Sequence, residues 1–127
     1  MTAYEIINRG FALAGESLDM YPDKNLALVW LNITLGESMD AENHIRERQS
    51  AKLLTLPAQR HNLSDEVEIS HILATVALPY GVAAYLFSDR EDNYMASVYR
   101  NRFVASLQDC AKGCETSVTD VYGGGYD

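Results

Sequence analysis

The sequence predicts an all-α protein: a small bundle of about four helices with an irregular middle segment and an extended C-terminal tail. Apolar residues recur at helical spacing over most of the chain, and helix-capping residues precede those stretches. The periodicity fails only between residues 50 and 69 and again after Gly113. We therefore expect one helical domain over residues 1–112 and a flexible tail over residues 113–127.

A chain of 127 residues suits one domain that can bury a hydrophobic core without disulfides or metal. Its content of 47% hydrophobic and 22% charged residues is ordinary for a globular protein. The first five residues lack the features of a signal peptide, and no stretch approaches the roughly 18 apolar residues of a membrane span. We expect a protein that is made and folded in a cytoplasm, without a membrane partner.

The first helix is predicted from a capping box at the N-terminus. Thr2 is an N-cap residue, and Glu5 stands three residues later. This helix is expected to end near Leu13, because Gly15 is a typical stop signal.

The second helix is predicted to be long, beginning close to Pro22 and ending near Arg48. Its expected apolar stripe makes Trp30 a core residue. The stretch from Asp40 to Arg48 is almost wholly polar, so we expect this end to project from the core or to contact another subunit. The stripe contains Leu26, Leu28, Val29, Trp30, Leu31, Ile33, Leu35 and Met39.

Residues 50–69 are predicted to form a loop with possible short strands. Ser70 then caps a third helix that contains Pro79, so this helix either kinks or restarts at the proline. Asp92 or Asn93 opens the last helix. We expect it to end at about Lys112, with Gly113 as its stop.

The third and fourth helices carry the most informative stretch, residues 78–103. It consists of Leu-Pro-Tyr-Gly-Val-Ala-Ala-Tyr-Leu, then an acidic break, then Tyr-Arg-Asn-Arg-Phe. This combination resembles the small helical head-to-tail connector (adaptor) proteins of tailed bacteriophages, and the order of the remaining elements fits the same plan. The resemblance favours a kinked but continuous helix through Pro79.

The resemblance implies a structural virion protein rather than an enzyme, with no cofactor. Such an adaptor forms a homo-oligomeric ring, dodecameric like the portal protein on which it docks, in the neck between capsid and tail. A stopper, tail-terminator or tail protein would lie below the ring, and DNA would pass through it without specific binding. The alternatives are another neck or tail-completion protein of the virion, or a small helical regulator or enzyme subunit.

The C-terminal tail is the predicted portal-binding segment. Its three glycines carry a large ordering entropy, and its two tyrosines offer rigid amphipathic anchors. In the connector family such tails reach the portal ring, whereas a frayed terminus without a task is the alternative. The candidate contact residues are Val118, Val121, Tyr122, Gly123, Gly124, Gly125 and Tyr126.

The net charge of −8 argues against a sequence-independent nucleic-acid binder. Basic residues gather locally, but intrahelical partners such as Glu42 before Arg46 favour solvated helix faces. If copies form a ring, a negative channel lining would repel the duplex and let it slide. The local groups are Arg46, Arg48 and Lys52, and then Arg100 and Arg102.

We expect no catalytic or metal site. Cys110 and Cys114 lie four residues apart without a second pair, so they are predicted to be reduced thiols near a helix end. The Glu-x-x-His string of Glu68 and His71 occurs once, whereas helical di-iron proteins carry it twice. The acidic residues Asp89, Glu91 and Asp92 lack the spacing of a calcium loop and fit a helix N-terminus better.

Overall fold

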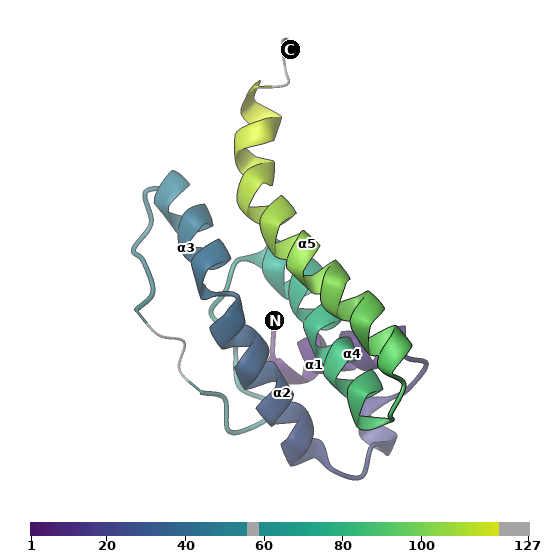
Figure 1. Cartoon of the computed structure of the whole chain (residues 1–127). Coiled ribbons are helices and arrows are strands. Elements are labelled where there is room, and N and C mark those ends of the chain that lie inside the picture. The colour runs from purple at the N-terminus through teal and green to yellow at the C-terminus, as the bar shows by residue number, and fades with distance from the viewer. Residues whose placement is uncertain (56–58, 120–127) are drawn as a thin grey trace.

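The computed structural model of the chain describes residues 1–55 and 59–119, with side chains described as far as Lys112. The described residues form five α-helices without any strand, so the predicted all-α class is confirmed (Figure 1). A 3-10 turn (Leu18–Met20) precedes α2, and a π-helical turn (Leu73–Ala77) leads into α4. The helices are α1 (Ala3–Leu13), α2 (Lys24–Glu37), α3 (Met39–Arg48), α4 (Leu78–Asp89) and α5 (Asn93–Thr119).

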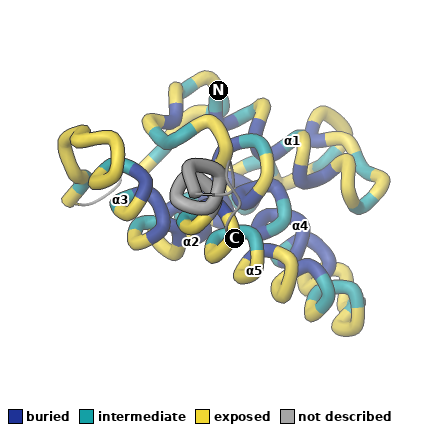
Figure 2. The backbone as a smooth tube through the Cα atoms, turned by 90° about the horizontal axis from the view of Figure 1, so that it is seen from above, coloured by how far each residue is buried: buried dark blue, intermediate teal, exposed yellow. Residues whose placement is uncertain are grey.

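Helix α4 is the centre of the bundle, because it packs against α1, α2 and α5. Its residues Leu78, Val82 and Leu86 are fully buried and join the main core with side chains of α1 and α2. The outer turns of the surrounding helices remain exposed (Figure 2). A helix that is apolar on most sides is expected in such a central position.

Two glycines allow the helices to approach α4 closely. A Cβ atom at Gly81 would lie 2.6 Å from Thr34 Cγ2 and 3.1 Å from Phe103 Cδ1. A Cβ atom at Gly10 of α1 would lie 2.8 Å from the Pro79 carbonyl oxygen. Both positions therefore need a residue without a side chain.

The predicted helix boundaries at Thr2, Gly15 and Asp92 are confirmed. Thr2 and Glu5 form the capping box at the start of α1. Gly15, directly after the C-cap of α1, has a φ of 75°. At the start of α5 the Asp92 carboxylate accepts a hydrogen bond of 3.2 Å from the Met95 backbone N–H.

The prediction of one long helix to Arg48 is wrong, because the helix is interrupted at Ser38, between α2 and α3. The Ser38 hydroxyl donates to the Thr34 carbonyl at 2.7 Å, a contact that competes with the helical ladder and bends helices. The apolar stripe is also narrower than predicted. Trp30 is buried as expected, but Val29 and Ile33 are 50% and 42% exposed.

Helix α3 does not project from the core, so the first of the two alternatives for its polar sequence is wrong, and contact with another subunit stays a prediction. Ala41 and Ile45 are buried in a second apolar cluster with Phe103 and Cys110 of α5. Two apolar residues four apart are enough to fix one face of a helix this short, although they give only a weak sequence signal.

The π-helical turn leads directly into α4, and Pro79 is the second residue of α4, in its first turn. Proline lacks the N–H that would continue the α-helical pattern, and the π-helical turn just before it absorbs the change. In that turn the Leu78 N–H donates to the Leu73 carbonyl, five residues back.

The predicted end of the last helix at Lys112 is wrong, because α5 continues to Thr119. An interior glycine costs a helix only about 1 kcal/mol, so Gly113 is not sufficient to stop it.

The described part of the middle segment is irregular, and its sole β-type contact is an isolated bridge between Thr2 and Glu66. Its backbone is held along α2 and α3 by two asparagine side chains. Asn32 exchanges two hydrogen bonds with the backbone of Arg60, and Asn43 does the same with Leu54.

Candidate functional site: a groove between α3 and α5

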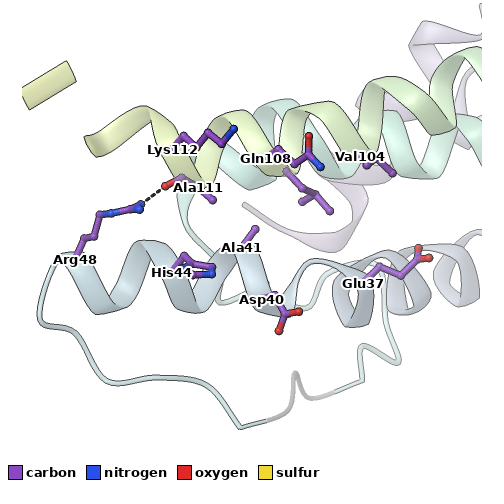
Figure 3. Close-up of a pocket in the computed structure, with 10 residues that line it drawn as sticks. Glu37, Asp40, Ala41, His44, Arg48, Val104, Gln108, Ala111 and Lys112 are labelled. Carbon is purple, nitrogen blue, oxygen red and sulfur yellow. Dashed lines mark hydrogen bonds between the residues drawn. The ribbon is translucent and has the colours of Figure 1, made fainter. Parts of the chain in front are cut away.

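A groove of about 470 Å³ lies between α3 and α5. It forms because α3 and α5 touch through Ala41, Ile45, Phe103 and Cys110 beneath it, while Ala41 and Ala111 are too small to fill the space above. Figure 3 shows the lining residues on the two helices. They are Glu37, Asp40, Ala41, His44, Arg48, Val104, Leu107, Gln108, Ala111 and Lys112.

An ion pair marks the end of the groove near α2. The Arg100 guanidinium donates two hydrogen bonds, of 3.0 and 2.6 Å, to the two carboxylate oxygens of Glu37. The hydrogen bond to Glu37 raises the pKa of Arg100. Tyr85 donates to the same carboxylate at 3.3 Å, and burial, followed by the charge of Glu37, raises the pKa of Tyr85. Arg100 also lies over the Phe103 ring at 5.3 Å, so its guanidinium contacts both a carboxylate and an aromatic ring.

A second arginine closes the other end. The Arg48 guanidinium of α3 donates to the carbonyl oxygen of Ala111 on α5 (Figure 3). The hydrogen bond ties the two helices together where α3 ends. The contacts of Arg100 and Arg48 thus mark the two ends of the groove.

The groove combines apolar side chains with opposite charges at its two ends. Val104, 41% exposed, and the half-buried Leu107 offer apolar contact area. Asp40 lies with Glu37 toward one end, and Lys112 lies with Arg48 at the other. Such a trough can bind one or two apolar side chains of a partner and orient them by charge.

Glu42, on the opposite side of α3, is a buried carboxylate that sequence analysis treated as a surface residue. The predicted pairing of Glu42 with Arg46 is confirmed, but the Glu42 side chain is only 1% exposed. Its other oxygen accepts a hydrogen bond of 2.8 Å from the Ser70 N–H, at the start of the third helical segment. Local spacing predicts the ion pair and gives no signal for the contact with Ser70, 28 residues away.

The predicted portal-binding residues are only partly placed. Val118 lies in the last turn of α5, where side chains are outside the description. The other candidates, Val121, Tyr122, Gly123, Gly124, Gly125 and Tyr126, lie outside the described residues.

Cys110 is buried, and the Cys114 side chain lies outside the description, so the predicted state of the two thiols stays a prediction. Within the described part of the chain, no group of three histidine, cysteine or acidic residues is placed to hold a metal ion. None of the described helices is long and apolar enough to cross a membrane.

Comparisons with known proteins found no matching family model, curated protein or solved structure.

Proposed function

We propose that this chain is a structural assembly subunit, a head-to-tail adaptor that docks on the portal vertex of a tailed bacteriophage. The proposal starts from the resemblance of residues 78–103 to connector proteins, and these residues fold as the helix pair α4 and α5. The proposed function involves neither catalysis nor a cofactor. Its partners are the portal protein above and a stopper, tail-terminator or tail protein below.

The observation that best supports this proposal is the length of α5. Its C-terminal part extends beyond the other helices of the bundle (Figure 1). The end of α5 at Thr119 therefore lies away from the helical body, where a partner can reach it. A contact segment at the end of a rigid helix can bind the portal without rearrangement of the bundle.

In this proposal, identical subunits form a ring, dodecameric like the portal, in the virion neck after synthesis in the host cytoplasm. The net charge of −8 suits a channel through which DNA passes without binding, since like charges repel. A ring assembled on the portal gains avidity from many weak contacts.

Electron microscopy of the purified protein mixed with portal rings of the same virion tests the proposal. Three forms should be compared: the full chain, a chain truncated after Thr119, and a full chain with Tyr122→Ser and Tyr126→Ser. We expect a cap of density on the portal with the full chain and its loss in both other forms. A cap that survives truncation would move the contact to the helical body, and no cap with any form would contradict the adaptor proposal.

A small helical regulator or enzyme subunit is the second candidate, and the groove between α3 and α5 favours it. Its volume of about 470 Å³ falls within the range of small-molecule sites. Thermal-shift screening against a metabolite library tests this function. A ligand whose stabilisation is lost in Leu107→Glu, but kept in the exposed control Ala105→Glu, would support it.

A further inference from the structure

One exposed aromatic side chain lies at the opposite end of α5 from the groove. Tyr94, in the first turn of α5, is 76% exposed. Tyrosine has few rotatable bonds and a large apolar ring, so it is a favourable anchor residue at protein interfaces. A ring this exposed makes few contacts within its own subunit, and it gains contact area when a partner covers it.

The turn that presents Tyr94 is held by backbone hydrogen bonds, a cation–π contact and an ion pair. The Asp92 and Glu91 N–H groups donate to the carbonyls of Phe87 and Ser88 at 2.9 and 3.0 Å. Arg90 lies over the Phe87 ring at 5.4 Å and pairs with Glu16 at 2.9 Å. A partner that binds here therefore orders few additional groups, which lowers the entropic cost of association.

The charges of the turn complement one end of the groove. Asp89 and Glu91 are exposed acids on either side of Arg90, and Asp92 follows. Lys112 of α5 lines the groove at the same end as Arg48 of α3. The aromatic ring of Tyr94 suits the apolar lining of the groove, and the acidic residues of the turn suit its cationic end.

We propose that Tyr94 of one copy of this chain inserts into the groove between α3 and α5 of a second copy, with Glu91 facing Lys112. A chain cannot fill its own groove in this way, because ten residues of continuous helix, about 15 Å, separate Tyr94 from Val104. The contact is heterologous, since the turn and the groove are different surfaces. Repeated contacts of this kind generate a ring if the rotation closes and a filament if it does not.

Sedimentation velocity of the full chain over a concentration series up to roughly 1 mM tests the contact. The wild-type average mass should rise with concentration, and Tyr94→Ser should raise the apparent dissociation constant at least about tenfold. Ile72→Ser, at another exposed apolar position, is the matched control and should leave it unchanged. Circular dichroism verifies that each variant is folded.

A charge exchange separates this contact from other modes of self-association. Glu91→Lys and Lys112→Glu should each weaken it, and the double variant should recover most of the loss, because the pair is restored in reverse. A monomer at every concentration, no effect of Tyr94→Ser, or no recovery in the double variant would overturn the inference. The experiment contains no portal, so its outcome is independent of the test of the proposed function.

Discussion

Asn43 and Leu54 are paired like neighbouring residues of two β-strands. The Asn43 amide accepts a hydrogen bond from the Leu54 N–H and donates one to the Leu54 carbonyl, both at 2.9 Å. Asn32 of α2 and Arg60 repeat this arrangement, at 3.1 and 2.9 Å. Two amides thus replace a sheet partner for an otherwise irregular segment.

Asn43→Ala should detach the backbone of Leu54 from α3. The substitution removes two hydrogen bonds of the partly buried amide, so we expect a loss of about 1–2 kcal/mol in the free energy of unfolding. Hydrogen exchange should show faster exchange of the Leu54 amide. Asn101→Ala is the matched control, because Asn101 is an exposed helical residue with the same gain in helix propensity. Equal stability and equal Leu54 exchange in the two variants would contradict the structural role of Asn43.

The sequence predicts the parts of this fold that local chemistry determines. The capping box of Thr2 and the Asp92 cap give the starts of α1 and α5, and Gly15 marks the end of α1. The break at Ser38 was missed, because its hydroxyl contact with Thr34 lies inside a stretch with continuous apolar periodicity.

The groove was missed for a different reason. It exists because α3 lies beside α5, and Ala41 and Ala111 leave space there. Neither helix carries a local pattern that identifies the other as its neighbour. The predicted tail residues, in turn, lie outside the described part of the chain apart from Val118. Pairing between distant segments, rather than helix formation, limits prediction of the candidate site.

Gly81→Ala should destabilise the protein because the new methyl group would meet Thr34 and the Phe103 ring. The Cβ atom would lie 2.6 Å from Thr34 Cγ2, so α2 or α4 must shift, and overpacking of this kind costs about 1–3 kcal/mol.

Gly36→Ala is the matched control for Gly81→Ala. A Cβ atom at Gly36 meets nothing within 4 Å, so this variant should gain about 0.4–1 kcal/mol through the unfolded state. Urea denaturation of both variants measures the difference. Two variants that change stability in the same direction would be incompatible with the close approach at Gly81.

Glu42→Ala should be more harmful than removal of an exposed acid from the same helix. It leaves the Ser70 N–H without its carboxylate acceptor and leaves Arg46 only its hydrogen bond to the Lys52 carbonyl, so we expect a loss of about 2–4 kcal/mol in the free energy of unfolding. Glu42→Gln can keep one hydrogen bond, so its free energy of unfolding should lie between those of the wild type and Glu42→Ala. Exposed Glu47→Ala serves as the control, with a change within about 0.5 kcal/mol. Chemical denaturation gives all three values, and equal losses at Glu42 and Glu47 would refute the role of the buried carboxylate.

The alkaline pH dependence of stability should report on Tyr21. Burial, followed by a hydrogen bond of 2.9 Å to Asp89, raises the pKa of Tyr21 from 10.0 to about 12. Its contribution to stability is therefore complete below about pH 10 and is lost as the pH rises toward about 12, because the unfolded chain ionises first.

Ultraviolet titration of the phenolate absorbance measures this pKa, and Tyr21→Phe assigns the signal among the eight tyrosines. The variant should lack the late-titrating component and should lose less stability than the wild type above pH 10. Asp89→Asn removes the charge but not the burial of the ring, so it should lower the pKa of Tyr21 only in part. A full return to 10.0 in Asp89→Asn would show that the carboxylate, rather than burial, dominates the shift.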